Sequence, residues 1–247
     1  PLPYLCVGGY VLLLAGYPAC WEQNSSFAVR RETAHPPSLC MMNPELEILL
    51  NPEKLLAVYA GGMFPMAPSQ DSPEVYWFAP EERGILPLEA FHVSRNVCRW
   101  IRNHPHRIGV DEQFEAVMRA CADRPDTWIS GLIVEAYLRL HQVGHAHSVE
   151  VYVGSELVGG LYGVSLGAAF FGESMFKRAP EMDKVALHYC HRLLLQGGYR
   201  LWDTQYYTEH LGTLGAQEIP QDAYLQLLDA ALRQQARFPR RLAVGLR

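Results

Sequence analysis

Two glycine-rich apolar runs separated by a short turn constrain the fold of this chain most strongly. The first run covers residues 157–164 and the second covers residues 168–172. Short continuous apolar runs bounded by turn residues are typical of strands that are buried on both faces. Glu173 follows the second run directly. We therefore expect its carboxyl group to lie where water is scarce.

Glu173, Asp203 and Gln205 are the candidates for chemistry. Asp203 and Gln205 stand at the end of another apolar run, so a second carboxylate and an amide join the first acid. Ionisation of a buried carboxyl group depends on its neighbours, and such groups are concentrated at functional sites. The alternative for Glu173 is a buried acid that pairs with an arginine for structural reasons. The pattern alone leaves both interpretations open.

The periodicity of the remaining segments predicts an α+β fold. Apolar residues recur at helical spacing over residues 52–60, 114–121, 129–140, 185–194 and 224–232. Residues 149–153 alternate between apolar and polar, Gly154 and Ser155 supply a turn, and the two glycine-rich runs follow, which indicates an antiparallel meander. Asp183 is a candidate cap for the helix over 185–194, which crosses over to a strand at residues 199–204.

The composition divides the chain into three parts. Residues 1–41 include half of the six cysteines, lack a clear period and carry no charge before Glu22, so we expect a poorly patterned extension. Residues 42–79 form a small N-terminal lobe with an irregular stretch rich in proline and aromatic residues, and residues 80–247 form the main domain. The apolar stretch at residues 10–16 is too short to span a bilayer and no basic residue precedes it, so export is not expected.

Several function classes lack support. A formal net charge of -5 and a pI near 6.1 argue against a surface that binds nucleic acid everywhere, although a local basic patch is compatible with them. The six cysteines contain no CxxC pair, which favours reduced thiols in a cytoplasmic setting. Neither a phosphate-binding GxxxxGK[ST] loop nor a dinucleotide-binding GxGxxG motif opens a helix after a strand.

Two clusters of basic side chains remain to be interpreted. His141, His145 and His147 lack a carboxylate or cysteine that would complete a ligand set at zinc-like spacing, so roles as caps or at the core edge are favoured over metal binding. Arg95, Arg99 and Arg102 fall on one face if their segment is helical. That stripe is either a phosphate contact or a solvated helix face, and spacing alone does not decide.

Many of these residues belong to a series of motifs that occur in order over residues 51–228: 59–66, Trp77 with Pro80 and Arg83, 92–95, 127–129, 136–141, 145–151, 157–164, 172–176, Asp203 with Gln205, 214–216, and Ile219 with Pro220. Together these segments resemble one known family, the leucyl/phenylalanyl-tRNA–protein transferases. The number of separate matches makes the resemblance far more specific than any single short motif.

The resemblance implies an enzyme that moves leucine or phenylalanine, and by extension methionine, from aminoacyl-tRNA to an acceptor protein that begins with arginine or lysine, marking it for degradation. It implies a C-terminal domain similar to the GNAT acyltransferases behind a small N-terminal lobe. The ester on the tRNA is already activated, so the enzyme has to position an amine and manage a proton, without a cofactor or a metal. The implied setting is the cytoplasm, with no membrane partner.

The resemblance also assigns roles to residues. Asp203 and Gln205 match the family's catalytic pair, and Glu173 matches a residue that recognises the positive end of the acceptor. Because an uncharged amide is a very weak base, we expect Gln205 to position the amine and Asp203 or Glu173 to hold the cationic acceptor. The resemblance also implies a pocket for the donor side chain, formed by Leu161, Phe170, Leu187 and Leu194. It implies a platform for the terminal nucleoside at Trp128 and Met66, where Met66 stands in a position that is often tryptophan. It further implies a tRNA contact at Arg95, Arg99 and Arg102.

Departures from the family's pattern keep alternatives open. Residues 43–50 replace a usual glycine-rich segment, and residues 177–184 replace a stretch of small residues. The nearest alternative is the same reaction with another donor amino acid or an acidic acceptor. The others are an acetyltransferase that uses acetyl-CoA, which is disfavoured because no pyrophosphate-binding loop is evident, and a catalytically silent tRNA-binding module.

Overall fold

A seven-stranded mixed sheet forms the centre of the molecule. The computed structural model describes residues 4–7, 10–13 and 44–243 of the 247-residue chain. The strand order is β11-β5-β10-β9-β8-β7-β6. The strands are β5 (Glu82–Ile85), β6 (Arg107–Val110), β7 (Ala146–Val153), β8 (Glu156–Leu166), β9 (Ala169–Lys177), β10 (Leu201–Gln205) and β11 (Gln217–Pro220). Neighbouring strands are antiparallel except β9 and β10, which are parallel.

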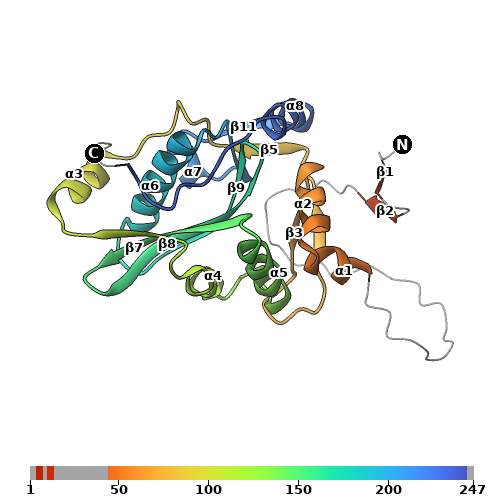
Figure 1. The fold of residues 1–247 in the computed structure, drawn as a ribbon, viewed down its shortest axis with the longest axis horizontal. Coiled ribbons are helices and arrows are strands. Elements are labelled where there is room, and N and C mark those ends of the chain that lie inside the picture. Colours follow the sequence, from red (N-terminus) through yellow and green to blue (C-terminus); the bar gives the residue numbers. More distant parts are fainter. Residues whose placement is uncertain (1–3, 8–9, 14–43, 244–247) are drawn as a thin grey trace.

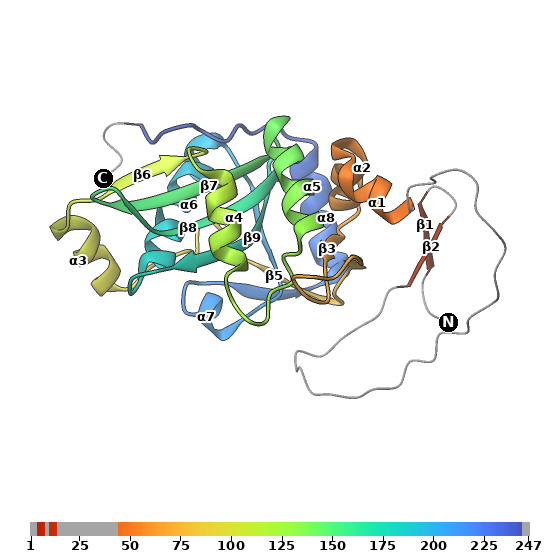
Figure 2. The same cartoon turned by 90° about the horizontal axis from the view of Figure 1, so that it is seen from below.

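Helices cover both faces of this sheet (Figures 1 and 2). The helices α4 (Phe114–Ala122) and α5 (Gly131–Gln142) lie on one face, and α6 (Met182–Gly197) lies on the other. α6 is the crossover between the parallel strands β9 and β10, as a parallel connection requires. Each face has its own hydrophobic cluster, one around Tyr137 and Phe171 and one around Phe170 and Leu194. The predicted α+β class is confirmed, and the sheet is mixed.

The remaining elements surround the sheet. α1 (Pro44–Leu50), α2 (Pro52–Ala60) and the antiparallel pair of β3 (Phe64–Met66) with β4 (Tyr76–Phe78) lie at the end of the sheet near α5, whereas α3 (Arg95–Asn103) lies at the opposite end of the molecule (Figure 1). α7 (Glu209–Gly212) follows β10, and α8 (Gln221–Leu232) follows β11. β1 (Tyr4–Val7) and β2 (Tyr10–Leu13) form an antiparallel pair, and the rest of the predicted 1–41 extension lies outside the described residues.

Local signals in the sequence explain the helix boundaries. The side chain of Asn51 accepts a hydrogen bond from the backbone N–H of Lys54, and Pro52 occupies the first position of α2. The side chains of Ser94 and Ser130 cap α3 and α5 in the same manner. Gly198 caps the C-terminal end of α6, and its φ of 82° is in the left-handed region that glycine adopts without a steric penalty.

Three local predictions require correction. Asp183 does not cap α6 but lies within its first turn, after Glu181 at the N-cap position. The stretch before Pro80 is not wholly irregular, because β3 and β4 pair there. The second glycine-rich strand does not end at Gly172 but continues to Lys177. The polar side chains from Glu173 onward hid this continuation, and they place Glu173 in the middle of β9.

Candidate active site

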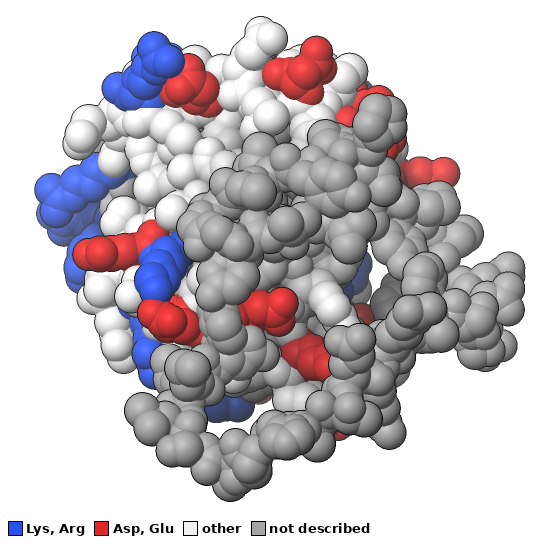
Figure 3. All heavy atoms as spheres, turned by 90° about the vertical axis from the view of Figure 1, so that its right-hand side faces the viewer, with Lys and Arg blue, Asp and Glu red and all other residues white. Residues whose placement is uncertain are grey.

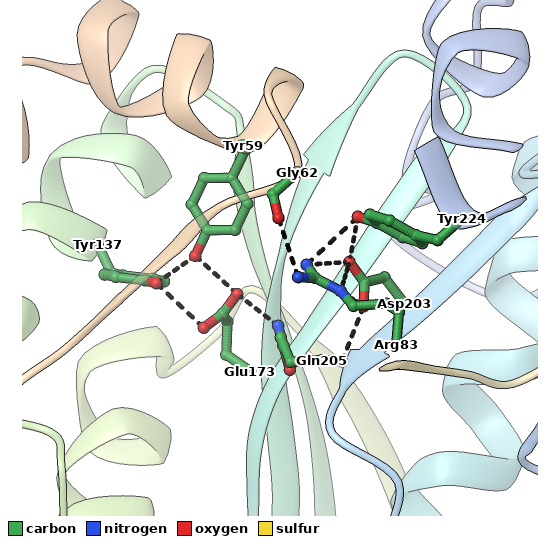
Figure 4. A network of polar contacts seen from close by, with 8 residues as sticks. All are labelled: Tyr59, Gly62, Arg83, Tyr137, Glu173, Asp203, Gln205 and Tyr224. Carbon is green, nitrogen blue, oxygen red and sulfur yellow. Dashed lines mark hydrogen bonds and ion pairs between the residues drawn. The ribbon is translucent and has the colours of Figure 1, made fainter. Parts of the chain in front are cut away.

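Glu173 lies at the meeting point of four elements (Figure 4). Its Oε1 atom accepts hydrogen bonds from the hydroxyl of Tyr59 in α2 at 2.7 Å and from Nε2 of Gln205 in β10 at 3.1 Å. Its Oε2 atom is 3.0 Å from the hydroxyl of Tyr137 in α5, and the two tyrosine hydroxyls also hydrogen-bond to each other. The sequence prediction that Glu173 and Gln205 converge agrees with this geometry.

Asp203 forms a buried ion pair with Arg83 beside this group (Figure 4). Its Oδ1 atom accepts from Nε of Arg83 at 3.0 Å and from the backbone N–H of Gln205 at 2.7 Å. Its Oδ2 atom accepts from Nη2 of Arg83 at 2.7 Å and from the hydroxyl of Tyr224 at 2.6 Å. The exposed fractions of the Arg83 and Asp203 side chains are 1% and 0%. The sequence left open that Glu173 is a buried acid paired with an arginine. In the structure that description fits Asp203 and not Glu173.

The pairing of β5 with β10 creates this arrangement. Asp203 lies opposite Ile85, and a bulge then places Gln205 opposite Gly84. Gln205 has a φ of 58°, a left-handed conformation that is uncommon for residues other than glycine. A Cβ atom at Gly84 would lie 2.6 Å from backbone atoms of Tyr206 and Tyr207, so only glycine admits this close crossing. The bulge turns the Gln205 amide toward Glu173.

The environment of Glu173 favours its neutral form. Desolvation is the largest effect and raises the pKa of Glu173 to about 8. Hydrogen bonds from Tyr59 and Tyr137 oppose this shift, Asp203 adds to it, and Arg83 opposes it. Burial, and as a smaller effect the nearby Glu173, also raises the pKa of Tyr59 and of Tyr137. Both tyrosines therefore keep their hydroxyl protons. A carboxyl group with a pKa near that of an amine is suited to exchange a proton with one.

A cavity of about 480 Å³ opens beside Glu173. It is lined by Arg124, Glu173, Ser174, Met175, Phe176, Lys177, Asp183, Thr208, His210 and Leu211. Met175 and Leu211 also pack against the hydrophobic cluster on the α6 face, so the cavity extends from the carboxyl group toward that cluster. This is enough room for a peptide terminus next to the acid.

The four residues of the predicted side-chain pocket lie together. Leu161, Phe170, Leu187 and Leu194 all belong to the buried cluster between the sheet and α6. Tyr59 and Tyr137, which hold Glu173, belong to the cluster around α4 and α5. The sheet therefore separates these four residues from the tyrosines, and Met175 and Leu211 of the cavity beside Glu173 pack against the same cluster as the four residues.

The predicted nucleoside platform and tRNA contact occupy different places. Trp128 and Met66 are neighbours, because the backbone oxygen of Trp128 accepts a hydrogen bond from Ala67, and both side chains are partly buried. Arg95, Arg99 and Arg102 are exposed on α3, which confirms that their segment is helical. On the face at the α1 end, acidic and basic side chains both occur among the described residues (Figure 3).

The three histidines bond to two backbone oxygens and to one carboxylate. Nδ1 of His141 and Nδ1 of His145 bond to the backbone oxygens of Ala146 and Ser165, each at 2.8 Å. Nδ1 of His147 bonds to Asp111 at 2.9 Å. These side chains border a second cavity of about 510 Å³. Within the described part of the chain, no three histidine, cysteine, aspartate or glutamate side chains are grouped so that they could hold a metal ion.

Four residues of the network received no role from the sequence. Tyr59, Tyr137 and Arg83 stand inside the motifs of the resemblance, but a motif does not say which side chain meets which. Tyr224 was visible only as an apolar helix position. Two signals were available: a buried acid needs a cation, and a tyrosine on a buried helix face needs a partner for its hydroxyl. Neither signal names the partner, because more than 100 residues separate Arg83 from Asp203 in the chain.

Comparisons with known proteins give a consistent result. A family model described as leucyl/phenylalanyl-tRNA protein transferase matches residues 85–229. Relatives named leucyl/phenylalanyl-tRNA–protein transferase include one from Cereibacter sphaeroides (strain KD131), which is 52% identical over 189 residues that cover 76% of this chain and 88% of the relative. Another, from Paramagnetospirillum magneticum, is 52% identical over 200 residues that cover 79% of this chain and 96% of the relative.

Similarity to solved structures is much weaker. The crystal structure of FemX is 11% identical with a TM-score of 0.40, and the match covers 70% of each chain. No helix among the described residues is long and apolar enough to cross a membrane. The sequence matches are decisive, because they cover most of both chains at about half identity. The chain belongs to the leucyl/phenylalanyl-tRNA–protein transferase family.

Proposed function

We propose that this aminoacyltransferase moves leucine or phenylalanine from its tRNA to acceptor proteins that begin with arginine or lysine. Membership of the family supplies the reaction class, which is transfer from aminoacyl-tRNA to protein. The observation that carries the choice of acceptor is Glu173, which borders a cavity of about 480 Å³ and has no ion-pair partner among the described residues. A cationic N-terminal residue in this cavity can supply that partner. Marking of the acceptor for degradation is a further part of the proposal.

The chemistry requires little beyond positioning. The amine nitrogen forms a bond to the ester carbon, the bond from that carbon to the ribose oxygen breaks, and a proton passes from the amine to that oxygen, which leaves as a hydroxyl group. Alignment of two reactants in a fixed site accounts for a large part of the barrier in such reactions. A donor near the carbonyl oxygen stabilises the charge that develops there.

Gln205 and Asp203 have distinct roles in this proposal. Every oxygen of Asp203 is engaged by Arg83, Tyr224 or the Gln205 backbone, so Asp203 holds Gln205 in place and does not bind the acceptor. Gln205 uses one amide hydrogen on Glu173, which leaves its other polar atoms to orient the amine or the ester. Glu173 is then the acid that meets the cationic acceptor.

The donor end extends from the apolar recess to the α3 helix. Leu161, Phe170, Leu187 and Leu194 offer an apolar environment for the donor side chain, and Trp128 beside Met66 offers a surface for the terminal nucleoside. The exposed arginines of α3 are the proposed contact with the tRNA backbone. A reaction on aminoacyl-tRNA belongs in the cytoplasm, where that donor is made.

The finer description of the fold is also a proposal. A GNAT-like catalytic domain at residues 80–247 is supported by the meander of β7, β8 and β9, the crossover helix α6 and the parallel strand β10. A small N-terminal lobe at residues 42–79 is supported by the separate β3 and β4 pair. Residues 1–41 are proposed to be an extension of this catalytic unit.

A transfer assay tests the proposed function. Labelled leucine on its tRNA is incubated with the protein and with peptides that begin with arginine, lysine, aspartate or glutamate. We expect transfer to the first two only, with labelled phenylalanine behaving similarly, and loss of about two orders of magnitude in rate for Gln205→Ala. The matched control is Gln142→Ala, an exposed glutamine at the end of α5, which keeps the full rate.

The same assay decides between the remaining alternatives. Transfer to peptides that begin with aspartate or glutamate would show that the acceptor is acidic and that the proposed basic acceptor is wrong. A gel shift with leucyl-tRNA without transfer to any peptide would indicate a silent tRNA-binding module. Circular dichroism of Gln205→Ala establishes that any loss of rate is not a loss of fold.

A further inference from the structure

Tyr59, Tyr137 and Glu173 form a closed ring of three polar contacts (Figure 4). The hydroxyl of Tyr59 is 2.7 Å from Oε1 of Glu173, and the hydroxyl of Tyr137 is 3.0 Å from Oε2. The two hydroxyls hydrogen-bond to each other and close the ring. Tyr59 and Tyr137 are each 0% exposed, so no water reaches their hydroxyls from bulk solvent to relieve an unfavourable contact.

Counting protons decides the protonation state of this ring. Three oxygen–oxygen contacts need three protons if each is to be a hydrogen bond. The two tyrosine hydroxyls supply two of them. With an ionised carboxylate, one contact would bring two oxygen lone pairs together in a site of low polarity, at a cost that buried groups avoid. The third proton therefore has to reside on Glu173.

We infer that Tyr59 and Tyr137 are positioning residues that hold Glu173 in its neutral, protonated form in the free protein, and that this proton leaves when a cationic acceptor binds. The proton fits best on Oε2, because Oε1 already accepts from Gln205 as well as from Tyr59. With Glu173 ionised, both tyrosine hydroxyls donate to the carboxylate and no proton remains for the contact between them. With Glu173 protonated, Oε2 donates to Tyr137, Tyr137 donates to Tyr59, and Tyr59 donates to Oε1. Hydrogen bonds in one direction around a ring strengthen one another.

The surroundings of Glu173 agree with a neutral carboxyl group. Within the described part of the chain, no lysine, arginine or histidine forms an ion pair with Glu173. Arg83 is committed to Asp203, and Lys177 lies 3.2 Å from Asp183. The titratable and charged groups that face Glu173 from the neighbouring elements and the cavity are Tyr59, Tyr137, Tyr162, Arg83, Asp203, Arg124, Lys177, Asp183 and His210.

The ring links acceptor binding to proton release. A cationic acceptor gains an ion pair with Glu173 only after the carboxyl group ionises. The proton of Glu173 then passes to solvent through the cavity that Glu173 borders, whereas the attacking amine gives its proton to the ribose oxygen. This step rests on the proposed function, but the protonation state of the free protein does not.

The first experiment compares the stability of the wild type with that of Glu173→Gln across pH. Glutamine mimics the protonated acid, because its carbonyl can accept from Tyr59 and its amide can donate to Tyr137. The folded-state pKa of about 8 lies above the unfolded value of about 4.3, so the contribution of Glu173 to stability is complete below the lower value and is lost as pH rises through the upper one.

The expected result is a growing advantage for the glutamine variant. The ratio of its folding equilibrium constant to that of the wild type should rise by close to tenfold for each pH unit between about 5 and 8. Urea denaturation at several pH values measures it. A ratio that stays constant over this range would overturn the inference. Carbon NMR of the glutamate-labelled wild type checks the protonation state of Glu173 without a variant, because one carboxyl group should titrate near pH 8.

A double-mutant cycle tests whether the ring is closed. At pH 6 the loss of stability in the Tyr59→Phe/Tyr137→Phe double variant should be smaller than the sum of the two single losses, because the contact between the hydroxyls is counted in both singles. Additive losses would mean two independent donors without a ring. Tyr162→Phe is the matched control, since the buried Tyr162 hydroxyl has no partner among the described residues and its removal should not destabilise the protein.

The pH dependence of transfer tests the link to the acceptor. With an arginine-starting peptide, log kcat/KM should rise with a slope approaching two as pH increases toward 8, because the amine and Glu173 each have to lose a proton. A slope of one would show that only the amine titrates and would overturn the coupling. Absence of transfer at every pH would instead refute the proposed function, while the stability and NMR results would still report on the ring.

Discussion

Asp203 is the residue whose environment restricts its chemistry most. It accepts hydrogen bonds from Arg83, from Tyr224 and from the Gln205 backbone, and Arg83 in turn donates to the backbone oxygen of Gly62 at 2.9 Å. Arg83 also packs against the ring of Tyr224, with 4.4 Å between the guanidinium carbon and the ring centroid. A carboxylate held this way orients its neighbours and is not available as a base.

Asp203→Ala should therefore lower stability as well as activity. Removing one partner of a buried ion pair leaves an uncompensated charge, which typically costs about 3–5 kcal/mol. Urea denaturation measures the loss. The double variant Arg83→Met/Asp203→Leu should be more stable than Asp203→Ala, because it buries no lone charge. If Asp203→Ala were as stable as the wild type, the ion pair between Arg83 and Asp203 would not be formed in solution.

Gly84→Ala tests the bulge that turns Gln205 toward Glu173. The added methyl group would lie 2.6 Å from backbone atoms of Tyr206 and Tyr207, so we expect a loss of about 1–3 kcal/mol and a displaced Gln205. Gly131→Ala is the control, since nothing lies within 4 Å of the methyl group that it would gain and alanine favours the helix by up to about 1 kcal/mol. Equal effects of the two substitutions would contradict the close crossing.

At the scale of elements, the helices and the meander were predictable and several short strands were not. The sequence predicted α2, α4, α5, α6 and α8 and the β7, β8 and β9 meander, because each has a clear period and end signals. β5, β6 and β11 have only four residues each, too few to show alternation. β5 is nevertheless flanked by β10 and β11 in the sheet, and it carries Arg83 to Asp203.

The α3 helix should control the salt dependence of tRNA binding. Its arginines Arg95, Arg99 and Arg102 are exposed, and Arg99 is held by Asn96 at 2.8 Å. Replacing Arg95 and Arg102 by alanine should weaken binding and reduce the slope of log affinity against log salt by roughly one per lost phosphate contact. Filter binding at several salt concentrations measures the slope. Arg119→Ala on α4 removes an exposed arginine paired to Glu115 and should leave the slope unchanged.

At the scale of the whole molecule, the described segment before residue 80 shares its core with the main sheet. Leu55, Tyr59 and Phe64 belong to the same hydrophobic cluster as Phe171 and Tyr224. The polar network crosses the same boundary, since Tyr59 holds Glu173 and Gly62 accepts from Arg83. Segments that share a core and a buried network unfold together.

We therefore expect one cooperative unfolding transition for the described residues from 44 onward. Tryptophan fluorescence and far-ultraviolet circular dichroism should give the same midpoint, and the calorimetric and van 't Hoff enthalpies should agree. A fragment that begins at residue 80 should not fold stably, because it lacks the partners of Phe171 and Arg83. Two separate transitions would show that the lobe folds independently of the sheet.

The sequence by itself determined the class of fold, the location of the meander and the three polar residues Glu173, Asp203 and Gln205. These features depend on local periodicity and on residue types that apolar segments rarely contain, so they can be read along the chain. Only the tertiary structure decided which acid meets which partner. Arg83 neutralises Asp203, whereas Glu173 receives two tyrosine hydroxyls and an amide. The reason is physical: strand order and register bring together residues far apart in the chain, and the protonation state of a carboxyl group depends on those neighbours.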